Sequence, residues 1–270
     1  MTQFTLPTRY YRAIPIDRPS YETVNFGLNV DNTALVGIHC WNIGCVDGPA
    51  INNDYCVGMG WPQATEEAGR IMSGMIRPAM DSARSLGMNV VHVESDWMDT
   101  WYPDMESRRS GKNVRFQPIH HREIMDRAHG PEYLQKSPIA HMRRAEIVSP
   151  IGNESLFFYS DLLDTYLKER GIKTLIYAGF ATDMCVLNAE GGARAMLERG
   201  YRCILIRDAT VGVETPQSFP ERLATRYGIH IFEWKIGYST TFDQLCNAFS
   251  SNTRDFNMDP SLGRPPEQGD

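Results

Sequence analysis

Short apolar runs alternate along the chain with stretches of helical periodicity. The first run, residues 33–39, is Thr-Ala-Leu-Val-Gly-Ile-His and has almost no polar interruption. Continuous apolar runs of this length are typical of central parallel strands that are covered on both faces. Further strands are predicted at residues 88–94, 174–178, 203–207 and 229–234.

Helices are predicted between these strands. Residues 62–87 repeat apolar side chains at the spacing of one helical face and end on Gly87, a common helix stop. The other predicted helices are residues 161–170, 185–198, 216–227 and 241–249. Strands that alternate with helices of this length indicate βαβ units, and therefore a parallel sheet with helices on both faces.

The pattern divides the chain into three parts. Residues 1–30 hold three prolines and little periodicity, and they are expected to form an extended arm on the body or on a neighbouring subunit. Residues 31–250 form the predicted α/β domain. Residues 251–270 are a polar tail that is expected to fray. Within the domain, periodicity is weak over residues 97–150, which predicts a long loop that is either functional or poorly ordered.

Composition limits the classes of partner. Thirty-three acidic against 27 basic residues give a net charge of −6, which disfavours nucleic acid or an anionic membrane as the main partner. No apolar stretch is long enough to span a membrane, and the first residues do not resemble a signal peptide. A cytoplasmic protein with free thiols is therefore predicted.

Chemistry is expected just beyond the carboxyl ends of the strands, where ligands bind in parallel sheets. Cys185 follows the strand at residues 174–178 and opens a predicted helix. The positive end of a helix, with its free N–H groups, lowers a thiol pKa and can bind an oxyanion. The alternative is a small residue that packs in the first helical turn.

The segment at residues 179–186, Gly-x-x-Thr-Asp-x-Cys-Val, resembles the signature of the isochorismatase-like cysteine hydrolases. These include nicotinamidases, N-carbamoylsarcosine amidase and ureidoacrylate amidohydrolase. Residues 32–39, 171–179 and 200–209 resemble other landmarks of the family in the same order. The similarity covers roughly residues 30–235.

The resemblance implies a Rossmann-like sheet of six parallel strands with helices on both faces, and Cys185 as a nucleophile that attacks amides. It implies an oxyanion hole from the backbone N–H of Cys185 and of Ala181 or Thr182. A non-proline cis peptide near Ala181–Thr182 and assembly into dimers or tetramers are implied as well.

Two family residues are replaced in this sequence. His39 stands where the family has the Asp that acts as general base, and residues 149–158 contain no counterpart of the family's Lys. A neutral imidazole can take a thiol proton itself, and the resulting imidazolium supplies positive charge, so losing Asp and Lys together is coherent. His39 is therefore the predicted base. The alternative is a hydrogen-bonded core histidine in a site that has lost its chemistry.

The metal pair Asp-x-His of nicotinamidase-type relatives is absent, because the matching residues are Glu94-Ser-Asp-Trp. No metal and no other cofactor are predicted. Trp41, Glu94, Asp96 and Trp97 are candidates for binding substrate, with packing or a solvated strand end as the alternative.

The predicted function is a metal-independent cysteine hydrolase of a small amide or related C–N substrate. A catalytically degenerate family member that binds a small ligand or a partner is the second hypothesis. A vinyl-ether hydrolase is disfavoured because that chemistry depends on the missing Asp.

Overall fold

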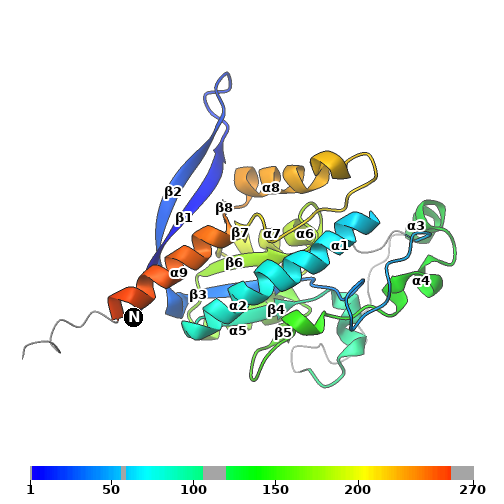
Figure 1. Ribbon diagram of the computed structural model, residues 1–270, viewed down its shortest axis with the longest axis horizontal. Coiled ribbons are helices and arrows are strands. Elements are labelled where there is room, and N and C mark those ends of the chain that lie inside the picture. Colours follow the sequence, from blue (N-terminus) through cyan, green and yellow to red (C-terminus); the bar gives the residue numbers. More distant parts are fainter. Residues whose placement is uncertain (1, 56–58, 106–119, 257–270) are drawn as a thin grey trace, which may run out of the picture.

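The computed structural model describes residues 2–55, 59–105 and 120–256, and its centre is one mixed sheet flanked by helices (Figure 1). The strands are β1 (Gln3–Arg12), β2 (Ser20–Asn29), β3 (Thr33–Ile38), β4 (Asn89–Val93), β5 (Leu156–Phe157), β6 (Thr174–Gly179), β7 (Arg202–Ile206) and β8 (Tyr238–Thr240). Their order across the sheet is β2-β1-β8-β7-β6-β3-β4-β5.

The six strands from β8 to β5 are all parallel, which confirms the predicted fold class. The sheet has eight strands rather than six because a β1–β2 hairpin adds to it. Ten residues of β1 pair antiparallel with β2, and β1 meets β8 at the pair Arg9–Ser239. The hairpin projects well beyond the body of the molecule (Figure 1).

Two layers of helices cover the sheet, and two short helices lie beyond one end of it (Figure 1). One face carries α1 (Pro62–Ile71), α2 (Arg77–Ser85) and α9 (Phe242–Phe256), with the π-helical turn η2 (Met72–Ile76) joining the first two. The other face carries α5 (Ser160–Glu169), α6 (Cys185–Asn188), α7 (Ala193–Leu197) and α8 (Leu223–Lys235). The end helices are α3 (His121–His129) and α4 (Tyr133–Lys136). The short 3-10 turns are η1 (Val30–Asn32), η3 (Asp96–Trp101), η4 (Pro138–Ala140), η5 (Glu146–Val148) and η6 (Phe219–Glu221).

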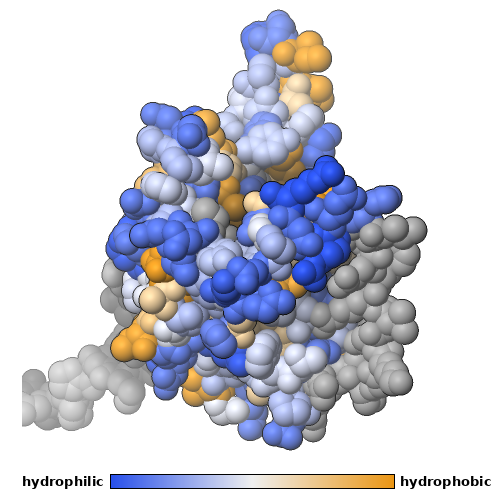
Figure 2. Space-filling view, turned by 90° about the vertical axis from the view of Figure 1, so that its right-hand side faces the viewer, coloured by the Kyte–Doolittle hydropathy of each residue, from blue (hydrophilic) through white to orange (hydrophobic). Residues whose placement is uncertain are grey.

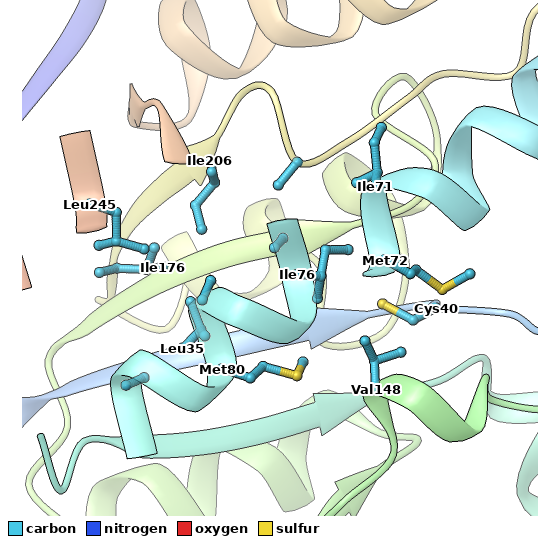
Figure 3. Close-up of a cluster of buried hydrophobic side chains, with 14 of the residues drawn as sticks. Leu35, Cys40, Ile71, Met72, Ile76, Met80, Val148, Ile176, Ile206 and Leu245 are labelled. Carbon is cyan, nitrogen blue, oxygen red and sulfur yellow. The ribbon is translucent and has the colours of Figure 1, made fainter. Parts of the chain in front are cut away.

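Successive strand residues point to opposite faces and fill two separate cores. On β3, Leu35 packs against α1 and α2, whereas Val36 packs against the α5–α8 side. Figure 3 shows Leu35 and Ile176 on the sheet and Ile76 and Met80 on the helical layer above them. Burying each of these side chains contributes roughly 1.5–3 kcal/mol.

The two chain ends differ from the expected secondary structure. Residues 1–30 form the hairpin, because Phe4 and Leu6 alternate with exposed residues and bury one face of β1. The strand predicted at 229–234 lies in the C-terminal half of α8, where Phe232, and Ile236 just past the helix end, reach the core at helical spacing. The sixth parallel strand is instead β8, which is only three residues long.

The helix predicted over residues 185–198 is divided into α6 and α7 at residues 189–192. Gly191 has φ +65° there, and a Cβ atom at this position would lie 2.8 Å from a methyl group of Val93. The predicted polar tail begins inside α9, and residues 257–270 lie outside the described residues. The proposed boundaries of arm, domain and tail stay predictions.

Candidate active site

Three predicted side chains follow the carboxyl ends of neighbouring strands. His39 comes directly after β3, Glu94 directly after β4, and Cys185 opens α6 after β6. Because β4, β3 and β6 are adjacent and parallel, these positions lie along one edge of the sheet.

The backbone at this edge stays tightly joined beyond the strands. The amide of His39 donates to the Val93 carbonyl at 2.8 Å, and the amide of Phe180 donates to the Ile38 carbonyl at 3.0 Å. Gly179 has φ +131°, and a Cβ atom there would lie 1.9 Å from the Ile38 carbonyl oxygen. Only glycine permits this close approach of β3 and β6.

Cys185 is half-buried, and its sulfur accepts a hydrogen bond from the amide of Ala181. A non-proline cis peptide joins Phe180 to Ala181, one bond before the expected place. The amide of Thr182 is engaged with the Val211 carbonyl at 3.1 Å, whereas in the described residues the amide of Cys185 donates to no backbone carbonyl. The amide of Cys185 is therefore open to a substrate oxygen, and the amide of Ala181 could serve the same oxygen by giving up its bond to the sulfur.

The thiol pKa of Cys185 is raised to about 11, chiefly by burial and further by the carboxylates of Glu94 and Asp183. The sequence argument expected a lowered pKa. Helix α6 has only four residues, so its end supplies little positive charge against those effects. The free protein therefore carries Cys185 as a thiol at neutral pH.

The imidazole of His39 is buried, with an exposed fraction of 1%. Its backbone is left-handed, with φ +48°, a conformation that histidine adopts more readily than most residues. Nδ1 lies 3.3 Å from the hydroxyl of Ser95, and the ring stacks on Trp41 with ring centres 5.6 Å apart. Nε2 has no hydrogen-bond partner among the described residues, so it is not bonded to the Cys185 thiol.

The pKa of His39 is lowered to about 3, first by burial and then by the nearby charge of Arg144. A buried imidazole without a carboxylate partner is costly to protonate. His39 is therefore neutral at physiological pH, and the expected thiolate–imidazolium pair does not exist in the free protein.

Glu94 is completely buried and accepts hydrogen bonds at both carboxylate oxygens. Oε1 accepts from Nη1 of Arg144 at 2.8 Å, and Oε2 accepts from Nε1 of Trp41 at 2.9 Å. The amide of Cys40 also donates to this carboxylate. Burial raises the pKa of Glu94, although Arg144, Trp41 and Cys40 all act to lower it. Glu94 thus holds the indole of Trp41 in place, and that indole in turn covers one face of the His39 ring.

Arg144 was not predicted from the sequence, although it is the buried cation of the site. Nη2 donates to the Gly37 carbonyl at 3.2 Å and lies 2.8 Å from Nδ1 of His92, while Nε donates to the Val148 carbonyl at 3.0 Å. With the bond to Glu94, four of the five N–H groups of the guanidinium have partners in the protein. The only sequence signal was a pair of arginines in an aperiodic segment, which does not distinguish a buried cation from a solvated one.

The buried chain of polar groups continues away from the site. Since Arg144 only donates, Nδ1 of His92 accepts, and its Nε2–H donates to Glu154 at 2.8 Å. The pKa of His92 is lowered to about 4 by burial, and the bonds from Arg84 and His92 lower the pKa of Glu154 to about 2. In this row of buried polar groups, Arg144 is thus paired with Glu94 and Arg84 with Glu154.

The two remaining candidates lie in η3, just after Ser95. Asp96 and Trp97 are half-buried, and Trp97 packs against a third apolar cluster that includes Met98 and Phe158. In the part of the chain that the structure describes, no three His, Cys, Asp or Glu side chains gather to hold a metal ion.

Alkylation of Cys185 by iodoacetamide is expected to be slow at pH 7 and to rise steeply up to about pH 11. At pH 8 its thiolate fraction is roughly 100-fold smaller than that of a thiol with the usual pKa of 9.0. Mass-spectrometric peptide mapping over pH 6–11 measures this, and the half-buried Cys45, whose pKa is also raised by burial, is followed in the same samples. Fast labelling of Cys185 at pH 7 would show that the free site holds a thiolate.

Residues 51–219, more than half of the chain, match the isochorismatase domain family, and the chain belongs to that family. The predicted family and the predicted hydrolase class are thereby confirmed. The sequence is 28% identical over 184 residues to the ureidoacrylate amidohydrolase RutB of Stutzerimonas stutzeri, covering 65% of this chain and 69% of that protein. It is 24% identical over 188 residues to RutB of Agrobacterium fabrum, covering 65% and 75%.

Among solved structures, a cysteine hydrolase from Pseudomonas syringae pv. phaseolicola superposes with a TM-score of 0.54. It shares 17% sequence identity, and the match covers 83% of this chain and 95% of that one. The likeness shows a common fold.

Proposed function

We propose that the protein hydrolyses a small amide or related C–N bond with Cys185 as the nucleophile. The observation that carries the proposal is the position of the thiol at the carboxyl edge of the sheet, with the Ala181 amide directed at its sulfur. The similarity to two ureidoacrylate amidohydrolases supports C–N chemistry.

His39 is the proposed base, and it acts in its neutral form. As sulfur bonds to the substrate carbon, the S–H proton becomes strongly acidic, so even an imidazole of low basicity can accept it at Nε2. The carbonyl oxygen gains negative charge and takes hydrogen bonds from the amides of Ala181 and Cys185. This requires Nε2 to reach the thiol directly or through one water molecule.

Release of the amine reverses the proton transfer. A histidine with a pKa of about 3 is a strong acid once protonated, so it passes its proton readily to the leaving nitrogen. The C–N bond breaks and leaves a thioester on Cys185. Water then attacks the thioester, His39 takes its proton, and the carboxylic acid and free thiol are formed.

Trp41 is the proposed wall of the substrate pocket, because it is half-buried beside His39 and its indole N–H is fixed by Glu94. Glu94 itself supports the site without touching substrate, since both of its oxygens are occupied. Asp96 and Trp97 remain candidates for the outer part of the pocket.

The test is a panel of ureido acids, N-carbamoyl amino acids and aliphatic and aromatic primary amides. We expect ammonia release from at least one class, together with a transient acyl mass on the peptide that contains Cys185. Hydrolysis that survives complete alkylation of Cys185 would contradict the proposal.

A ligand-binding protein without turnover is the second candidate. It is favoured by one observation, namely that the thiol and the imidazole are both neutral and are not bonded to each other. A panel compound that raises the melting temperature without releasing ammonia would select this candidate.

A small-molecule substrate agrees with the family, and we further propose a cytoplasmic homo-oligomer. The tip of the β1–β2 hairpin exposes Ile14 and Ile16, with exposed fractions of 70% and 92%, and rises above the body in Figure 2. This supports a subunit contact through residues 1–30. In the described residues, no helix is both long and apolar enough to cross a membrane.

A further inference from the structure

We propose that Ser95 is the positioning residue for His39. Its hydroxyl oxygen accepts a hydrogen bond from Nδ1–H of the imidazole, which leaves the lone pair of Nε2 free to take the thiol proton. The inference rests on the proposed function, because it explains how this histidine can act as the base.

The first support is the pairing at the two ring nitrogens. Nδ1 of His39 is 3.3 Å from Oγ of Ser95, and both residues are buried, with exposed fractions of 1% and 9%. If Ser95 donated instead, Nε2 would carry the proton and would be a buried N–H without an acceptor. Buried N–H groups without partners are rarer and more costly than partly satisfied acceptors.

The second support is the rigidity of the turn that carries Ser95. Its carbonyl accepts the amide of Met98 at 2.9 Å, and Met98 is completely buried. One residue further on, Asp99 accepts the hydroxyl of Tyr159 at 2.6 Å. The backbone of Ser95 is therefore held at a fixed place between β4 and η3.

The third support is that the rest of the His39 ring is already confined. Trp41 covers one ring face, and Glu94 fixes the indole of Trp41. With Nδ1 taken by Ser95, Nε2 is the polar ring atom that remains for a substrate or for the Cys185 thiol. A nucleophile, a base and an orienting group thus occur together, as they do in catalytic triads on other folds.

A serine orients the imidazole without charging it. The charged group that acts on His39 is Arg144, from the segment before β5, and the carboxylate of Glu94, at the end of β4, is paired with that guanidinium. No carboxylate is paired with His39 in the described structure, so the ring stays neutral and keeps one unprotonated nitrogen.

The first test reads the tautomer and needs no substrate. Imidazole ¹⁵N chemical shifts are recorded on histidine-labelled protein, and a His39→Asn variant assigns the signal among the seven histidines. Wild type is expected to show the Nδ1–H form, Ser95→Ala a mixture or the Nε2–H form, and Ser95→Thr the wild-type form. An unchanged Nδ1–H signal in Ser95→Ala would overturn the inference.

The second test uses a substrate found with the amide panel. Ser95→Ala is expected to lower kcat roughly 10- to 100-fold at similar KM, a part of what a general base contributes, and Ser95→Thr should recover most of it. Ser95→Asp places a carboxylate beside Nδ1 and should raise the pKa of His39. The acid limb of the pH–rate profile should therefore shift to higher pH. Equal rates in Ser95→Ala and wild type would overturn the inference. If the tautomer of His39 changes in Ser95→Ala but wild type hydrolyses no compound of the panel, only the proposed function is contradicted.

Discussion

Replacing Arg144 by methionine is expected to lower the free energy of unfolding by about 3–5 kcal/mol. The side chains of Arg144 and Glu94 have exposed fractions of 1% and 0%, so the change leaves a carboxylate buried without its cation. It also removes the donors that serve the carbonyls of Gly37 and Val148 and Nδ1 of His92. Urea denaturation followed by tryptophan fluorescence at pH 7 measures the loss.

The neighbouring Arg143 gives a matched control. Its guanidinium lies 3.4 Å above the half-exposed ring of Trp101 and donates to the carbonyl of Met142. Arg143→Met is therefore expected to cost less than about 1 kcal/mol. Similar losses in the two variants would show that the buried pair does not stabilise the fold.

The pH dependence of the Arg144→Met deficit gives a second check. Without its cation, Glu94 has a folded-state pKa above its unfolded-state value, so the folded state binds the proton more tightly. The difference in stability between the variant and wild type should therefore shrink as pH falls from 8 towards 5. In the double variant Arg144→Met, Glu94→Gln, part of the loss should be recovered at pH 8.

The sheet could be predicted from local patterns, and its edges could not. The runs that became β3, β4, β6 and β7 are continuous and apolar, because both faces of a central strand are covered. β8, the last of the parallel strands before the hairpin, has only three residues, and the apolar run before it alternates like a strand while forming α8. Which of two neighbouring apolar runs joins the sheet is decided by packing rather than by local pattern.

The site was predictable to the extent that it follows strand ends. That rule identified His39, Glu94 and Cys185, which adjacent parallel strands bring to one edge. Arg144 was missed because its pairing with Glu94 spans 50 residues and joins a strand end to an aperiodic segment. The pKa directions were missed because they follow from burial, which the sequence does not give.

Arg144 also changes the charge argument for the site. The sequence predicts that replacing the family's Asp and losing its Lys removes one negative and one positive charge from the site together. The structure places a carboxylate and a cation at the same edge from other positions, Glu94 and Arg144, and they pair with each other. Glu94 still raises the thiol pKa of Cys185 despite its pairing with Arg144, so the thiol proton has to leave during bond formation.

Replacing Cys185 by alanine is expected to reduce turnover of any amide substrate at least about 10³-fold, since no other group in the proposed mechanism can form the thioester. Cys185→Ser should be nearly as inactive, because the hydroxyl proton is far harder for a histidine of pKa about 3 to remove than a thiol proton. Both variants should still bind the substrate, which calorimetry or a shift in melting temperature would show. Cys45→Ala, which removes another half-buried thiol, should keep the wild-type rate. Turnover in Cys185→Ala within tenfold of wild type would place the chemistry elsewhere in the molecule.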